Sequence, residues 1–395
     1  MIKGHLFRRL GLLGLSAGLV GLLAGAAPAV ATPADNPTAE SILGSGSDTT
    51  QFMMQAIDGL YLFSPGCNQL GSPQQLDFSC TEPDPPGTIT TENYKHDQVH
   101  EAYFLGSGNG KLQLCKQGLS GVANISFARS SSGPGGDCSG LRYVAYARDG
   151  ISWEAFAQGK QSGVGKNFNN QQGTCSGSGG ATKYCLSQAQ LNGIYVTCTI
   201  TNWKQVGGNP AGKTIQIYTP QAGSGTRKTW DGFVGGDSSH CIPANQQASH
   251  VIPENENAYI KANGNENTAI FPFSYGVWTT QIHGQDKSFL GAVDNVLPTP
   301  GTIGDGTFPF GRFLYNIYCN SCATGINATA ATVAYVGEEG WICEVEANHA
   351  NDPTTGVNYR TEIANTITAQ GFVPIPLGVI GGGDTNQDYC RLFTT

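Results

Sequence analysis

Short apolar runs and helix-like stretches alternate along most of the chain. The apolar runs predict strands at Gln98–Leu105, Val122–Phe127, Leu141–Ala147, Thr214–Tyr218 and Phe313–Tyr318. The helix-like stretches predict helices at Thr50–Gly59, Ile151–Ala157, Ser187–Ile194 and Thr226–Phe233. Strands that alternate with helices favour an α/β fold with largely parallel sheets.

Long polar segments separate these elements. Ser131–Gly140, Gly163–Gly180 and Asn255–Asn267 carry little apolar periodicity, so we expect elaborated loops there. The chain has 395 residues, which is enough for two domains of ordinary size that each bury a core. A single small module is therefore excluded.

The first 31 residues have the pattern of an export signal. Three basic residues precede an apolar run over Leu10–Leu23, and small residues follow up to Ala29-Val30-Ala31. We expect cleavage after Ala31. The run is rich in Gly and Ala and shorter than the roughly 20 strongly apolar residues of a membrane span. No Cys follows closely for a lipid anchor, so a soluble mature protein, periplasmic or secreted, is expected.

The charge of the chain argues against polyanionic partners. The formal net charge is −8, and removal of residues 1–31 would leave 18 basic and 29 acidic residues, or −11. A nucleic-acid binder needs clustered Lys and Arg, and the sequence has no such run. We therefore expect no nucleic-acid partner.

All 12 cysteines lie in the part that would be exported, which suits an oxidising compartment where thiols pair. The sequence does not give the connectivity, although local disulfides are expected in two polar stretches, Cys67 with Cys80 and Cys175 with Cys185. The only C-x-x-C is Cys319-Asn320-Ser321-Cys322. A structural disulfide is favoured there over a zinc site or a redox motif.

One pair of histidines is spaced so that it could bind a metal. His96 and His100 lie four residues apart and would share one face of a strand. No third ligand is evident nearby, so we predict neither a metal nor a cofactor.

Three segments share one design, in which an apolar run leads into glycines and hydroxyl residues and then into a helix start. Gly lets the backbone approach a ligand, Ser and Thr donate hydrogen bonds, and a helix N-terminus favours negative charge. Together they predict an anion site, although ordinary helix capping explains each segment alone. The segments are Ile42–Thr50, Tyr103–Gly110 and Ile217–Arg227. Trp203 and Trp230 flank the third, and we expect them in the core.

The sequence also resembles a known family, the phosphate-binding substrate-binding proteins of ABC importers, which have the periplasmic binding protein type II fold. The resemblance covers about residues 41 to 390, with insertions. It is carried by Leu186–Leu191, Ile200–Gly208, the Ser-Gly-Thr motif within Gly223–Arg227, Phe308–Tyr315 and Gly371–Pro376.

The resemblance implies a two-lobed α/β architecture, with two mixed or parallel sheets flanked by helices and a hinge of two crossover strands. Lobe one would comprise residues 40–147 and 314–395, and lobe two residues 148–313. An anion would lie in the cleft between them, in a monomer that delivers it to an ABC permease. The implied ligand-binding residues are Ser47, Asp48, Thr49, Ser107, Gly108, Arg129, Ser130, Ser131, Ser224, Gly225, Thr226 and Arg227.

The chain departs from the family at the position that accepts the proton of hydrogen phosphate. That position usually carries Asp and here carries Ser131. We hypothesise that Asp48 has taken over as acceptor, and the alternative is that Asp48 only caps the following helix. Which oxyanion is selected stays open.

A second departure concerns positive charge. The Arg often found four residues before the motif serine is Pro220 in this chain. Arg227 or Arg129 would replace it, and Arg227 is favoured because it follows the motif directly. The alternative for either residue is a structural salt bridge.

Two other functional classes remain. A serine hydrolase acting on phosphate esters is disfavoured, because Ala222–Thr226 lacks the first Gly of G-x-S-x-G and no triad or metallohydrolase motif is present. We therefore predict no enzyme. A secreted adhesion or structural protein on the same fold is the main alternative, since a lipid anchor is missing and loops and cysteines are abundant.

Overall fold

A computed structural model describes residues 42–62, 106–117, 125–156, 184–207, 213–375 and 390–395. Several predictions from the sequence lie outside these residues. They are the export signal at 1–31, the strand at 98–105, the loop at 163–180, the disulfide between Cys67 and Cys80, the thiol of Cys175, and the pair His96 and His100.

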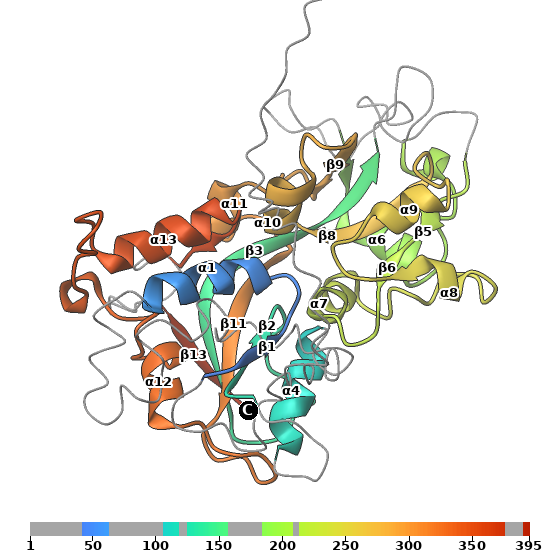
Figure 1. Cartoon of the computed structure of the whole chain (residues 1–395). Helices are drawn as coiled ribbons and strands as arrows, with labels where there is room; N and C mark the ends of the chain where they lie inside the picture. The colour runs from blue at the N-terminus through green and yellow to red at the C-terminus, as the bar shows by residue number, and fades with distance from the viewer. Residues whose placement is uncertain (1–41, 63–105, 118–124, 157–183, 208–212, 376–389) are drawn as a thin grey trace, which may run out of the picture. The chain divides into compact units, whose positions relative to one another are not determined.

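The central element is the long strand β3 (Leu141–Phe156), drawn in green in Figure 1. Its first part pairs antiparallel with β11 (Gly311–Cys319), and also with β12 (Val373–Pro374) and β13 (Arg391–Thr394). Its last part pairs antiparallel with β8 (Ala269–Ser274) and β9 (Ser288–Leu290). β3 thereby joins two groups of strands into one sheet.

Parallel pairs lie further from β3. β1 (Gly44–Gly46) pairs with β2 (Phe127–Ser130), and β5 (Gln216–Ile217) pairs with β8. Two small parallel ladders complete the set, β4 (Cys185–Leu186) with β10 (Ala292–Val293) and β6 (Thr219–Pro220) with β7 (Val251–Ile252). The predicted α/β class is confirmed, with mixed pairing and an antiparallel centre.

The predicted helix at Ile151–Ala157 is wrong, because Ile151–Phe156 continues strand β3. Every residue of this stretch is buried, and the segment pairs with β8 and β9. A strand covered on both faces shows no alternation of apolar and polar residues, so its sequence pattern cannot be told from that of a buried helix. The predicted strands Leu141–Ala147 and Phe313–Tyr318 are confirmed within β3 and β11.

Three predicted helices are confirmed as α1 (Gln51–Leu62), α6 (Gln188–Tyr195) and α7 (Gly225–Val234). The starts of α6 and α7 follow from capping chemistry. At α6, the Ser187 hydroxyl accepts from the Gln190 N–H, and the Gln190 side chain accepts from the Ser187 N–H. A fourth helix, α4 (Ser107–Lys116), begins inside the second Gly- and Ser-rich segment.

The remaining helices are mostly short. They are η3 (Trp203–Val206), α8 (Gln247–His250), α9 (Ala258–Ala262), α10 (Tyr275–Val277), the π-helix η4 (Trp278–Ile282), α11 (Pro300–Gly304), α12 (Ala330–Val336), η5 (Glu346–Asn348) and α13 (Tyr359–Ala369). The predicted loop Asn255–Asn267 thus contains a helix. The predicted loop Ser131–Gly140 is confirmed.

Buried aromatic side chains fill the core. Trp153, Trp203 and Trp230 are each fully buried, and they pack in one cluster with β8 and the helices α6 and α7. The expected core position of Trp203 and Trp230 is confirmed. Within the described part of the chain, no helix is long and apolar enough to cross a membrane.

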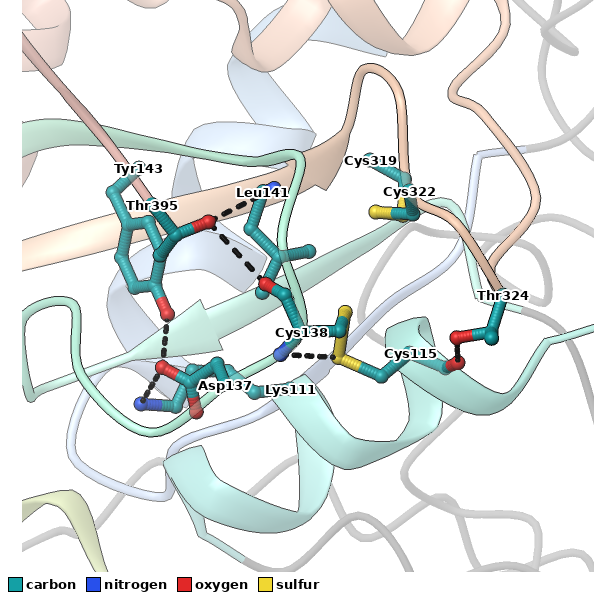
Figure 2. Close-up of a disulfide and its surroundings, with 10 residues drawn as sticks. All are labelled: Lys111, Cys115, Asp137, Cys138, Leu141, Tyr143, Cys319, Cys322, Thr324 and Thr395. Atoms are coloured by element: carbon teal, nitrogen blue, oxygen red, sulfur yellow. Dashed lines mark hydrogen bonds and ion pairs between the residues drawn. A yellow bond between two sulfur atoms is a disulfide. The ribbon is translucent and has the colours of Figure 1, made fainter.

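Disulfides tie the loops to this framework. The described pairs are Cys115–Cys138, Cys198–Cys241, Cys319–Cys322 and Cys343–Cys390, and Cys185 is also disulfide-bonded. The two cysteines of the C-x-x-C, Cys319 and Cys322, pair with each other, and a structural role for this disulfide stays a prediction. Figure 2 shows that the Cys115–Cys138 bond joins α4 to the loop before β3, where Asp137 lies between the Lys111 amine and the Tyr143 hydroxyl.

Candidate functional site

The three Gly- and hydroxyl-rich segments meet at one place through backbone hydrogen bonds. Gly106 N–H donates to the Gly46 carbonyl at 3.0 Å, which joins the second segment to the first. Gly108 N–H donates to the Gly223 carbonyl at 2.9 Å, which joins the second segment to the third. The starts of α4 and α7 are thereby fixed next to the end of β1.

Five buried hydroxyl side chains gather at this junction, and we call them the hydroxyl cluster: Ser47, Thr49, Ser107, Ser131 and Thr226. Ser47 Oγ donates to Ser131 Oγ at 3.0 Å. Ser107 Oγ accepts from Ser131 N–H at 2.9 Å and lies 3.3 Å from Ser131 Oγ. Thr49 Oγ1 and Thr226 Oγ1 are 3.4 Å apart. The hydroxyl cluster therefore includes residues from all three segments and Ser131, which directly follows β2.

A glycine makes this approach possible. A Cβ on Gly225 would lie 2.1 Å from Ser107 Oγ and 2.4 Å from Ser131 Oγ. Real Cβ atoms do not come that close to a hydroxyl oxygen, so only glycine lets the first turn of α7 reach the hydroxyl cluster. The Ser224 hydroxyl caps the same helix by accepting from Arg227 N–H at 3.0 Å.

Arg312, on β11, brings a buried guanidinium to the hydroxyl cluster. Its Nη1 donates to the Ser131 carbonyl and to Thr226 Oγ1, each at 3.1 Å. Its Nη2 and Nε donate to Asp149 Oδ2 at 2.7 and 3.0 Å. Arg312 lies within Phe308–Tyr315, a segment that carries the family resemblance, but no ligand-binding role was expected for it. An Arg inside an otherwise apolar strand was the signal that could have identified it.

Arg129, near the end of β2, holds the first segment in place through hydrogen bonds to the backbone of Ser47. Its Nε donates to the Ser47 carbonyl at 3.1 Å, and its own carbonyl accepts from Ser47 N–H at 3.0 Å. Burial lowers the pKa of Arg129 to about 10, and the negative charge of nearby Asp48 opposes this. The side chain is fully buried, so its charge acts on the hydroxyl cluster through a medium of low polarity.

Glu254 completes the site and was missed from the sequence. Its Oε2 accepts from the Ser224 hydroxyl and from Thr226 N–H at 3.3 Å, and its Oε1 accepts from the Thr49 hydroxyl at 3.4 Å. Burial raises the pKa of Glu254, and the negative charge of Asp48 raises it further. The residue follows β7, in a polar stretch that gave no signal beyond a loop.

The other predicted site residues have these positions. Asp48 is half-buried in the turn before α1, close to Arg129 and Glu254. Ser130 Oγ donates to the Ser132 carbonyl at 2.7 Å and shapes the turn after β2. Arg227 donates to Asp237 Oδ1 at 2.9 Å and to Ser239 Oγ at 2.8 Å, which is the salt-bridge alternative considered for it.

The chemistry of this site suits an oxyanion. Hydroxyl groups and helix N-termini donate hydrogen bonds, and two buried guanidinium groups supply positive charge, which the carboxyl groups of Asp149 and Glu254 offset when they are ionised. Among the described residues, no group of three or more His, Cys, Asp or Glu side chains is arranged to hold a metal ion. The site therefore offers hydrogen bonds and charge for binding.

The comparisons with known proteins place the chain in a family. A model of the PBP superfamily domain matches residues 88–336. No curated protein matches the sequence. The solved structures similar to this chain include a protein from Clostridium perfringens, assigned as a phosphate ABC transporter substrate-binding protein and solved with bound phosphate. It is 18% identical with a TM-score of 0.46, over 85% of this chain and 99% of that chain.

Two further solved structures are similar to this chain. An ABC-type phosphate transport receptor from Vibrio cholerae is 17% identical, with a TM-score of 0.43, over 84% of this chain and 99% of that one. A phosphate-binding protein from Stenotrophomonas maltophilia is 14% identical, with a TM-score of 0.46, over 85% of this chain and 91% of that one. The family match covers more than half of the sequence, so the chain belongs to the PBP superfamily, the periplasmic binding proteins.

Proposed function

We propose that this protein is an exported solute-binding protein that captures phosphate or a similar oxyanion for an ABC importer. The observation that carries the proposal is the buried hydroxyl cluster beside Arg312, at the junction of the three segments. Membership of a superfamily of binding proteins supports it. The solved relatives named above are described as phosphate receptors, and phosphate is therefore the first anion to test.

Binding would work by exchange of hydrogen bonds. In the structure the hydroxyls of Ser47, Ser107 and Ser131 bond to one another. Each hydroxyl can donate once, so an anion that enters would take these donors and accept from Arg312 as well. A hydrogen bond to a charged acceptor contributes about 2 kcal/mol, more than the neutral contacts it replaces.

The lobes assigned from the sequence remain part of this proposal. Residues 40–147 with 314–395 would form lobe one, and residues 148–313 lobe two. β3 pairs with β11 along its first part and with β8 and β9 along its last part, and this change supports a lobe boundary near the middle of β3. The hydroxyl cluster would then hold Ser47, Ser107 and Ser131 from lobe one and Thr226 from lobe two, and lobe closure would shield the anion from water.

We infer that the mature protein begins near residue 32 and is periplasmic or secreted. The disulfides described above agree with an oxidising compartment. The protein would act as a monomer, with an ABC permease as its partner. It would bind without turnover, since the Ser224 hydroxyl caps α7 and donates to Glu254.

Asp48 is proposed as an acceptor that helps to discriminate between anions. Its charge raises the pKa of Glu254 and opposes the fall in the pKa of Arg129, so it lies close to the site. The replacement Asp48→Asn tests the role by titration with phosphate and sulfate across pH. Unchanged discrimination between the two anions would leave Asp48 as a helix cap.

Titration calorimetry of the secreted protein with inorganic phosphate tests the function. We expect 1:1 binding that weakens at least tenfold in Thr226→Val, which removes a hydroxyl from the hydroxyl cluster. Thr368→Val, on the exposed face of α13, is the matched control and should bind like the wild type. If neither phosphate nor sulfate binds the wild type, the receptor proposal fails and the adhesion or structural alternative is favoured.

A further inference from the structure

The carboxylate of Glu254 uses hydrogen-bond donors that an anion would need. Thr226 N–H belongs to the first turn of α7, Ser224 is its N-cap, and Thr49 comes from the turn before α1. These are donors of the kind that bind a phosphate at a helix N-terminus. Glu254 is 3% exposed, so its carboxylate lies inside the site.

An ionised carboxylate and an oxyanion compete for such donors and also repel each other. Within the described residues at the site, Arg129 and Arg312 are cationic, and three side chains are acidic: Asp48, Asp149 and Glu254. With all five ionised, the negative charges already exceed the positive ones. A doubly charged anion would increase this excess in a buried region where charge is poorly screened.

Protonation of Glu254 would remove both the competition for hydrogen-bond donors and the charge repulsion. A protonated carboxyl carries no charge, and its O–H becomes a donor. The donors of α7 would then be free to bind the anion. Asp149 is less suited to this role, because it holds Arg312 through two hydrogen bonds and also accepts from Ser274 Oγ at 2.8 Å and Gly276 N–H at 3.1 Å.

We propose that Glu254 takes up a proton when the site captures an oxyanion, and that its carboxyl group then donates to the anion. This inference rests on the proposed function and adds proton coupling to it. The proton comes from solvent and binds one carboxylate oxygen, and no covalent bond to the anion forms. Anion capture and proton uptake are thereby one event.

The charged groups that face Glu254 set the direction of this coupling. Asp48, before α1, faces it with negative charge, and Arg312, on β11, faces it with positive charge. Burial and Asp48 raise the pKa of the carboxyl, while Arg312 and the donors of Ser224 and Thr226 lower it, with a net rise. An added anion raises that pKa further. Between the pKa of the free form and that of the bound form, binding takes up one proton, and the phosphate Kd rises up to tenfold per pH unit.

Titration calorimetry with sodium phosphate near pH 8.5 tests this inference on the secreted protein. Free phosphate at this pH is almost entirely hydrogen phosphate, so the ligand brings no extra proton from solution, and the comparison with Glu254→Gln tests whether uptake depends on the Glu254 carboxyl. Each protein is titrated in two buffers of different ionisation enthalpy. For the wild type we expect heats that differ between the two buffers, which corresponds to uptake of at most one proton per anion. For Glu254→Gln we expect equal heats and binding at least as tight as that of the wild type.

Glu346→Gln, at an exposed position, is the control and should keep the proton uptake of the wild type. Equal heats in the two buffers for wild-type protein that binds phosphate would overturn the inference and leave the proposed function intact. This comparison of two buffers uses the wild-type protein alone. Uptake that persists in a folded Glu254→Gln protein would place the proton elsewhere and overturn it too. No phosphate heat in any of the proteins would contradict the proposed function itself.

Discussion

Arg312 and Asp149 form a buried ion pair that leaves one side of the guanidinium facing the hydroxyl cluster. Nη2 and Nε lie 2.7 and 3.0 Å from Asp149 Oδ2, and the two side chains are 3% and 0% exposed. Nη1 is left to donate to Thr226 Oγ1 and to the Ser131 carbonyl. The planar guanidinium serves both sides at once, which an ammonium group cannot do.

Arg312→Lys should therefore weaken phosphate binding at least tenfold. The lysine amine can stay with Asp149 or reach the hydroxyl cluster, but its geometry does not satisfy both. Calorimetric titration measures the loss, and a melting curve checks that the variant is folded. Arg142 lies on β3, in the same ladder with β11, and Arg142→Lys is the control that should bind phosphate normally. An unchanged Kd in a folded Arg312→Lys protein would remove Arg312 from the site.

Gly225→Ala should impair both stability and binding. The added Cβ would meet the hydroxyls of Ser107 and Ser131 at 2.1 and 2.4 Å, and the first turn of α7 would have to move away. Gly232→Ala, on the same helix with nothing within 4 Å of an added Cβ, should instead stabilise the protein by about 1 kcal/mol. Melting curves and phosphate titrations of both variants measure these effects. Equal stability and equal phosphate affinity in the two variants would contradict the close approach of α7 to the hydroxyl cluster.

Loss of the Cys115–Cys138 disulfide should affect the site as well as stability. The bond closes a loop with a sequence separation of 23 residues, and its removal costs about 3 kcal/mol on the chain-entropy account. The loop links α4, whose first residue is Ser107, to the segment after Ser131. We expect the double variant Cys115→Ser, Cys138→Ser to melt earlier and to bind phosphate more weakly.

The matched control is the double variant Cys198→Ser, Cys241→Ser. This disulfide has a sequence separation of 43 residues and lies between the end of α6 and the segment before α8. Its loss should lower stability by a similar amount and leave the phosphate Kd unchanged. Equal losses of affinity in the two double variants would show a general effect of instability and would refute a specific role for the first disulfide.

His349 should make the protein less stable in acid. Burial and the charge of Arg360 lower the pKa of His349 to about 4, below its ordinary value of 6.5. The unfolded chain therefore binds the proton first, and stability falls as the pH drops from about 6.5 to 4. We expect a loss of about 2 kcal/mol, allowing for screening by solvent.

His349→Phe keeps a ring that can pack edge-on against Trp341 and removes the titration. Denaturant unfolding at several pH values should show a shallower acid loss in this variant than in the wild type. Parallel pH profiles for the two proteins would contradict a neutral buried imidazole at position 349.

The helix starts could be predicted because capping is local. Ser187 and Ser224 each accept from an N–H group only three residues further on, so the sequence alone indicated where α6 and α7 begin. The start of α4 was expected from its Gly- and Ser-rich segment, although Gly106 and Gly108 donate to the distant carbonyls of Gly46 and Gly223. The same segments supplied four of the five residues of the hydroxyl cluster, and the fifth, Ser131, came from the resemblance to the family.

Glu254 and Arg312 could not be predicted because their partners are distant in sequence. Glu254 and its partner Thr49 are 205 residues apart in sequence, and Arg312 and its partner Asp149 are 163 residues apart. Glu254 stands in no local motif that distinguishes it from a surface charge, and the place of Arg312 in a mostly apolar strand indicates burial without identifying its partner. The helix expected at Ile151–Ala157 was wrong for a related reason, since burial of β3 on both faces is a property of the assembled sheet.

The most direct test of the central claim is to locate the anion itself. Crystals of the secreted protein grown with arsenate, an analogue of phosphate that scatters anomalously, would place the arsenic atom without bias. The account predicts one strong anomalous peak within hydrogen-bonding reach of Ser107, Thr226 and Arg312, with full occupancy. A peak at any other place, or none there in a protein that binds arsenate in solution, would contradict it.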